Sequence, residues 1–441
     1  MEITKKIICS LLVLIPVFLI TGPAIPDIII TFSAIFFLII NLFFKYNYDV
    51  FNFNWFKISI IFWLFIIISS LFAFDFIKSL TESLIFVRFL IIPLLIIFFI
   101  FEYQFAIKIL FVIILLSVIF VIFDCLVQFF NYDSKTGFGQ DLLGYIPDNS
   151  PHFRLTGPFE DLVPGSYISR FAFLGLVPIY LFINNKILKK IIIIFYLGLA
   201  GSITYISGER IAFATFGLGL LIFILFNRKN KLYFFSLILM FFLIFISIKF
   251  HPAYKYNIIE STPIHNGLIL EKNIECKDTS KNNCTIVIKS QPKFFEVIRN
   301  FQKSAYGEIY LLAINMYKKN LLFGIGLNNY NDLCETKEFK KQLKDINCST
   351  HPHNFYLQWL IETGPICLLL FIIYLIYVFV FINKTQIKEI KLLSIITFII
   401  LFWPLMSTGS LTKNWYGVST FYILGVCAAL YKLNILNKKI F

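Results

Sequence analysis

A histidine at position 353 is well placed for acid–base chemistry. In His351-Pro352-His353-Asn354, Pro352 suits the first position of a helix that continues into a long apolar run. The positive end of a helix disfavours an imidazolium, so we expect His353 to stay neutral and able to accept a proton. That helix end would also suit an anion such as phosphate. In the alternative interpretation, His353 only caps the helix or forms a hydrogen bond at an interface.

The same apolar run carries a glycine followed by a proline. Eleven residues at 100° each return Gly364 to within about 20° of the His353 direction. A glycine there lets another backbone approach that face closely. Pro365 lacks the amide that a continuous helix needs, so we expect a kink.

Arg210 is the residue best suited to hold an anion. It ends the stretch Ser207-Gly208-Glu209-Arg210, which separates two apolar runs. A guanidinium stays charged at any relevant pH and can grip phosphate oxygens bidentately. The alternative is an interfacial arginine that pairs with Glu209 or extends its charge into water.

Two further arginines and a glycine pair are weaker candidates. Arg154 and Arg170 could add cationic charge to an anion site, or could belong to a salt-bridged loop. The lone Gly-x-Gly at Gly324 and Gly326 is weak as a nucleotide-binding signal, because no parallel sheet precedes it. The cysteine, histidine and acidic residues show no metal-ligand spacing, so we expect no metal and no other cofactor.

These candidates lie between long apolar segments. The chain has 441 residues, of which 59% are hydrophobic and 15% charged, and this composition excludes a water-soluble protein. Segments long enough to cross a hydrocarbon core of roughly 30 Å lie at residues 7–21, 27–44, 58–74, 84–101, 109–130, 168–183, 191–206, 211–226, 232–248, 365–382, 392–407 and 415–431. The sequence therefore predicts an all-α polytopic membrane protein with about twelve transmembrane helices.

The basic residues predict the orientation of these helices. With the N-terminus inside, 17 basic residues fall in inner loops, and the short outer loops hold only Lys78, Arg210 and Lys413. Cytoplasmic loops carry an excess of lysine and arginine, so we expect both termini in the cytoplasm. The net charge of +14 is explained in this way, and we expect no nucleic-acid partner.

A large outer loop divides the chain into three parts. These are residues 1–248 (helices one to nine, with a moderate outer loop at 131–167), 249–355 (the large outer loop, partly helical) and 356–441 (helices ten to twelve and a cytoplasmic tail). Within the large loop, Phe294–Asn320 has helical apolar spacing, whereas Glu260–Pro292 looks irregular.

Four of the eight cysteines also lie in the large outer loop. An even set of cysteines in an oxidising compartment suggests disulfides. The shortest loop closures pair Cys276 with Cys284 and Cys334 with Cys348. Four unpaired thiols are the alternative.

Taken together, the motifs resemble the O-antigen ligase and O-antigen polymerase superfamily of bacterial envelope glycosyltransferases. The most specific match is His353-Asn354 followed, after nine residues, by Gly364, which is similar to the histidine motif of the ligases. The family usually has Gly, Thr or Tyr three residues after that glycine, and this chain has Cys367.

Three other stretches carry the resemblance. Ser207-Gly208-Glu209-Arg210 looks like an outer-loop Ser/Thr-x-x-Arg motif, with Glu209 where a serine is commoner. The stretch from Gly324 to Tyr330 resembles a glycine turn that is structural in the family. The segment from Arg154 to Arg170 is similar to the family's basic, glycine-containing entry to a central span.

The chain departs from the family at a second arginine of the periplasmic loop. Aligning Tyr310 with the family's aromatic residue leaves Tyr306 at the arginine position. Lys303 or Arg299, one or two helical turns earlier, could substitute for it.

The resemblance implies transfer of a whole glycan from undecaprenyl diphosphate to a hydroxyl acceptor such as lipid A-core. The reaction would take place at the periplasmic face of the bacterial inner (cytoplasmic) membrane, without a metal. The implied roles are catalysis by His353 and Arg210, substrate binding by Arg154, Arg170, Lys303 and Asn354, and structural roles for Gly324, Gly326 and Gly364.

Several functions remain open at this point. The same superfamily includes O-antigen and polysaccharide polymerases and protein O-oligosaccharyltransferases, which use the same donor chemistry with other acceptors. A transporter or flippase of lipid-linked sugars is the alternative of another class. A flippase should carry charged residues deep in several helices and would not need a loop of this size.

Overall fold

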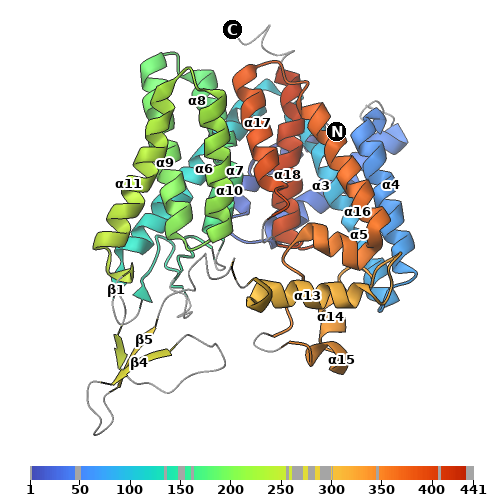
Figure 1. The fold of residues 1–441 in the computed structure, drawn as a ribbon. Coiled ribbons are helices and arrows are strands. Elements are labelled where there is room, and N and C mark those ends of the chain that lie inside the picture. Colours follow the sequence, from blue (N-terminus) through green and yellow to red (C-terminus); the bar gives the residue numbers. More distant parts are fainter. Residues whose placement is uncertain are drawn as a thin grey trace.

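The computed structural model shows an all-α membrane protein (Figure 1). It describes residues 2–44, 51–133, 137–147, 154–159, 163–254, 258–260, 272–276, 284–288, 299, 301–343, 347–405 and 409–433. Long apolar helices run side by side as a bundle, and shorter elements lie at one end of it.

The bundle helices follow the apolar runs of the sequence. In the first part these are α1 (Glu2–Val13), α2 (Ile15–Phe18), α3 (Ala24–Phe44), α4 (Asn54–Ser70), α5 (Phe76–Leu95, continued by the π-helical turn Ile96–Ile100) and α6 (Gln104–Phe130). Then come α7 (Pro164–Phe171), α8 (Val177–Phe182), α9 (Lys186–Ile206), α10 (Arg210–Phe226), α11 (Phe234–Phe250), α16 (Phe355–Ile382), α17 (Lys388–Leu401) and α18 (Asn414–Ala429). Helix α11 packs on α9, α16 on α4, and α18 on α5.

The structure does not support the count of twelve spans. Within the described residues, six helices are long and apolar enough to cross a membrane, and the pair α7 and α8, bent by 52°, makes a seventh if it is one span. Helices α4 and α10 are apolar but have only 17 residues, and α17 and α18 have 14 and 16. The first apolar run is divided between α1 and α2, with Pro16 in the first turn of the second helix.

A smaller helical unit lies at one end of the bundle. It contains α13 (Ala305–Tyr317), α14 (Tyr330–Cys334) and α15 (Lys337–Lys340), and Figure 1 shows α13 lying across that end of the bundle. Its core consists of apolar side chains from all three helices together with Ile325 and with Ile361 of α16. The helical spacing predicted over Phe294–Asn320 thus forms α13 in part of that range.

Short strands complete the described chain. Strands β1 (Tyr132–Asp133) and β2 (Gly137–Phe138) form an antiparallel pair. A second sheet has the order β3 (Ile258–Glu260), β5 (Cys284–Ile288) and β4 (Lys272–Cys276), also antiparallel. The prediction that Glu260–Pro292 is irregular was wrong for the residues of β4 and β5. The β-branched residues of Cys284–Ile288 favour a strand.

Candidate active site

Helix α16 begins three residues later than the sequence suggested. Its N-cap is Asn354, whose side chain accepts a hydrogen bond from the Leu357 amide at 3.0 Å. The same side chain donates to the Pro404 carbonyl at 3.0 Å, in the connection between α17 and α18. An asparagine with extended backbone is a strong N-cap, so it overrides the preference of Pro352 for a first helical position. His353 therefore precedes the helix, in a left-handed conformation with φ +52°.

The His353 imidazole is half-buried among other rings. The His351 ring lies 4.4 Å away between centroids, and the Tyr306 ring meets it edge-on at 5.7 Å and 86°. Burial lowers the pKa of His353 below its ordinary value. The imidazole is therefore neutral at pH 7 and able to accept a proton, and desolvation is the main cause.

The kink in α16 creates a docking point for another segment. Gly364 has φ +84°, and a Cβ placed there would lie 2.0 Å from the Leu322 carbonyl oxygen. Pro365 has no amide to donate to the carbonyl of Ile361 in the preceding turn. The Ile325 amide donates to that carbonyl instead, at 2.9 Å. Gly364 thus lets the backbone of residues 322–325 pack directly against α16.

The glycine turn connects this kink to the bundle. A Cβ on Gly324 would lie 2.5 Å from the carbonyl carbon of Glu362, and one on Gly326 would lie 2.3 Å from the Cβ of Ala73. Both glycines also have positive φ. On its other side, the turn accepts a hydrogen bond from the Phe74 amide to the Ile325 carbonyl at 2.8 Å. The turn is fully occupied by backbone packing, which supports a structural role and leaves no space for a nucleotide.

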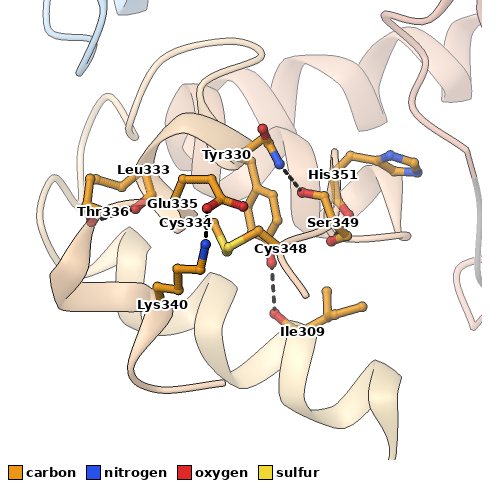
Figure 2. Close-up of a disulfide and its surroundings, with 11 residues drawn as sticks. Ile309, Tyr330, Leu333, Cys334, Glu335, Thr336, Lys340, Cys348, Ser349 and His351 are labelled. Atoms are coloured by element: carbon orange, nitrogen blue, oxygen red, sulfur yellow. Dashed lines mark hydrogen bonds and ion pairs between the residues drawn. A yellow bond between two sulfur atoms is a disulfide. The ribbon is translucent and has the colours of Figure 1, made fainter. Parts of the chain in front are cut away.

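A disulfide fixes the segment that leads to His353. Cys334 at the end of α14 is bonded to Cys348, as Figure 2 shows. Beside this bond, Asn331 donates a hydrogen bond to the Ser349 carbonyl at 3.1 Å, and the Ser349 hydroxyl donates to the His351 carbonyl at 2.9 Å. The side chains of the other predicted pair, Cys276 and Cys284, lie outside the described residues, although the two positions are direct backbone partners in β4 and β5.

Arg210 begins α10, next to a residue that anchors the preceding turn. The Glu209 carboxylate accepts hydrogen bonds from the Gly165 amide at 2.6 Å, the Ser166 amide at 3.1 Å and the Ser166 hydroxyl. Glu209 therefore occupies the N-terminus of α7. Burial is the largest influence on this carboxylate and raises its pKa to about 7, while the hydrogen bonds and Arg154 oppose the rise.

Arg154 lies against the same turn. A Cβ on Gly208, which has φ +80°, would lie 2.8 Å from the Cγ of Arg154, so the arginine side chain passes directly over that glycine. The charge of Arg154 acts on both Glu209 and Arg210. The structure thus brings two of the predicted anion-binding arginines together.

Arg170 and Lys303 are not among the arginines and lysines that the structure places beside Arg210. Arg170 is 6% exposed, donates to the Ser419 hydroxyl at 2.7 Å, and lies over the Tyr416 ring at 3.7 Å. Its guanidinium is engaged between α7 and α18, which argues against a direct grip on a substrate. The Lys303 side chain lies outside the described residues.

Tyr306 of α13 connects the two halves of the candidate site. Its ring contacts His353. Burial and then Arg154 lower the pKa of Arg210, and the Tyr306 phenol opposes that fall. One turn later on α13, the Tyr310 hydroxyl hydrogen-bonds with the side chain of Asn354. Tyr306 therefore links segments from distant parts of the sequence, the neutral imidazole of His353 and the guanidinium of Arg210.

Residues 195–372 match the family model described as O-antigen ligase. This segment is an O-antigen ligase family domain. The match confirms the resemblance to the O-antigen ligase and polymerase superfamily. No curated protein matches the chain.

The O-antigen ligase domain contains most of the candidate site. It includes Arg210, Tyr306, the glycine turn, His353 and Gly364, whereas Arg154 and Arg170 precede it. Members of the family are glycosyltransferase-like enzymes, and the match therefore suggests an activity of the O-antigen ligase or polymerase type. The apolar helices and the family together indicate a bacterial membrane protein.

Sequence reasoning gave no role to Tyr306, although the alignment placed it where the family carries an arginine. The available signal was the pair Tyr306 and Tyr310, which share one face of a helix at i and i+4. Among the described residues, no group of three or more histidine, cysteine or acidic side chains could hold a metal ion.

Proposed function

We propose that this protein transfers a glycan from undecaprenyl diphosphate to a hydroxyl acceptor, with lipid A-core as the acceptor. One observation carries the proposal. The neutral His353 imidazole contacts the Tyr306 ring, and the Arg210 guanidinium interacts electrostatically with the same tyrosine.

The chemistry follows from these two groups. The acceptor oxygen attacks the anomeric carbon, and His353 takes the hydroxyl proton. The bond from that carbon to the phosphate oxygen breaks, and its electron pair remains on the diphosphate. Arg210, with Arg154 beside it, stabilises the charge that develops there. In this scheme guanidinium groups do what a divalent cation would otherwise do, so the transfer needs no metal and no other cofactor.

We also propose that the site faces the periplasm, with both termini in the cytoplasm. Every loop that the basic-residue pattern assigns to the outside would then gather at one end. Three contacts between such loops support this: Phe74 with Ile325, Asn354 with Pro404, and Arg154 over Gly208.

This orientation requires an even number of spans. The number is twelve if α1 with α2, α7 with α8, and the short helices α4, α10, α17 and α18 cross the membrane as well. Residues 1–248, 249–355 and 356–441 would then be the nine-helix part, the large periplasmic loop and the three-helix part, with residues 131–167 as the moderate loop.

The test is a transfer assay with purified protein and a glycan on undecaprenyl diphosphate. Lipid A-core, a second lipid-linked repeat unit and an acceptor protein are supplied in separate reactions, each with and without EDTA. We expect a new glycosidic bond to lipid A-core, formed equally well with the chelator. Elongation of the lipid-linked repeat alone would make the protein a polymerase. Movement of the glycolipid across a bilayer without bond formation would contradict the proposal.

A further inference from the structure

Tyr306 occupies a position that its packing does not explain. The face of α13 that holds the helix in place carries Ile309, Leu312, Ala313 and Met316, all buried in the small core of the loop unit. Tyr306 is not part of this core and is 40% exposed, in the first turn of the helix. Its side chain is therefore available to something outside the protein's own core.

The neighbours of Tyr306 show what that could be. Its ring is nearly perpendicular to the His353 ring, with 5.7 Å between the ring centroids. Its phenol interacts electrostatically with Arg210, whose pKa burial and Arg154 lower and Tyr306 helps to raise. His353 and Arg210 are the two groups assigned to the acceptor proton and to the leaving diphosphate. The Tyr306 phenol, which interacts with both, has an O–H that can donate and an oxygen that can accept. Neutral His353 offers no positive charge to the diphosphate, so a further donor on this side would serve the leaving group.

We propose that Tyr306 is a catalytic residue whose hydroxyl donates a hydrogen bond to the diphosphate as the glycosidic bond to it breaks. The inference rests on the proposed function, because it needs a lipid diphosphate between Arg210 and His353. The proton stays on the phenol oxygen throughout, and His353 takes the acceptor proton. The tyrosine lowers the barrier by meeting charge that is larger in the transition state than in the bound donor.

The test compares Tyr306→Phe with Tyr306→Ala in full-length purified protein. The phenylalanine keeps the ring against His353 and removes only the hydroxyl. We expect kcat to fall about 10- to 100-fold, the loss of one hydrogen bond to a charged group. Product inhibition by undecaprenyl diphosphate should weaken as well. Tyr317→Phe is the matched control, because it removes a hydroxyl from the other end of α13 that donates to the Leu321 carbonyl at 2.7 Å. It should leave kcat unchanged within about twofold.

The outcomes separate this inference from the proposed function. Normal kcat in Tyr306→Phe with a large loss in Tyr306→Ala would show that only the ring matters and would overturn the inference. If His353→Ala abolishes transfer in the same assay while Tyr306→Phe does not, the proposed function stands and the inference fails. If His353→Ala transfers normally, the proposed function itself fails.

Discussion

The two halves of the candidate site are held in similar ways but by different parts of the molecule. In each half, the residue beside the reactive one anchors a helix N-terminus: Glu209 beside Arg210 occupies the start of α7, and Asn354 beside His353 caps α16. The arginine turn is thereby anchored inside the helical bundle. The histidine segment is also tied to the loop unit, through the Cys334–Cys348 disulfide.

This difference indicates which half is more vulnerable. The α9–α10 turn gains its position from packed membrane helices, which form the largest core of the protein. The histidine segment depends on a small core, a disulfide and a glycine turn. Disturbing the loop unit should therefore displace the base while leaving the anion-binding side in place.

Removing the base should have the largest effect. We expect His353→Ala to lower the transfer rate about 10²–10⁴-fold, because it removes positioned acid–base catalysis. Folded protein yield should change little, since the half-buried ring is not part of either core. The measurement is transfer at matched membrane levels, with His351→Ala alongside. The His351 ring packs on His353, but His351 precedes the motif. The loss of transfer rate in His351→Ala should therefore be at least ten times smaller than in His353→Ala. Equal losses in the two variants would contradict the role assigned to His353.

Changing the guanidinium should come next. Arg210→Lys keeps the charge but loses the bidentate geometry, and we expect a loss of about 10²-fold, as for removal of one preorganised donor. The control is Arg228→Lys in the connection that follows α10, an exposed residue at the other end of that helix. Full activity of Arg210→Lys in a transfer assay would mean that any cation suffices at this position.

Removing the disulfide tests the difference between the two halves directly. The Cys334→Ser and Cys348→Ser double variant should unfold its loop unit about 3 kcal/mol more easily, on the chain-entropy estimate. Transfer should fall several-fold because His353 is less well positioned. The affinity for undecaprenyl diphosphate should fall less than transfer does, because the arginine turn is anchored elsewhere and only Tyr306 contacts the diphosphate from the loop unit. An equal loss of transfer and of lipid affinity would show that the two halves are not held independently.

The smallest effect concerns pH. Only the neutral imidazole of His353 can take the proton from the hydroxyl group of the acceptor. Burial holds the pKa of His353 below the ordinary histidine value of about 6.5. The rate should therefore stay level as pH falls from 8 to about 6.5 and decline only at lower pH. A rate profile for the wild-type protein and for Arg210→Lys should show the same acid limb. A limb above pH 7 would contradict a base with a lowered pKa.

Local sequence patterns predicted the helices and several contacts, but not the residue at which α16 is capped. The apolar runs predicted the positions of the bundle helices, because a helix in lipid must be apolar along its length. Gly364 and Pro365 predicted the kink in α16 and the close approach of another backbone. The start of α16 was misplaced because Asn354 caps the helix more strongly than Pro352 begins one.

Long-range placement was beyond the sequence patterns. Arg170 looked equivalent to Arg154, yet only the folded bundle brings Ser419 and the Tyr416 ring to its guanidinium. Tyr306 lies beside His353 only because α13 docks across the end of α16. Contacts of this kind depend on how helices that are distant in the sequence pack together. The spacing of residues along the chain does not predict them.

A double-mutant cycle between His353 and Arg210 tests whether the two side chains act at one site. Transfer from undecaprenyl diphosphate is measured for wild type, His353→Ala, Arg210→Lys and the double variant, at matched levels of folded protein. Two groups that stabilise the same transition state depend on each other. Once one is removed, removing the second costs little further rate, so the fold-losses of the single variants do not multiply in the double variant. We predict that the double variant is within about threefold of the more impaired single variant. Losses that multiply in full would show that His353 and Arg210 do not act at one site.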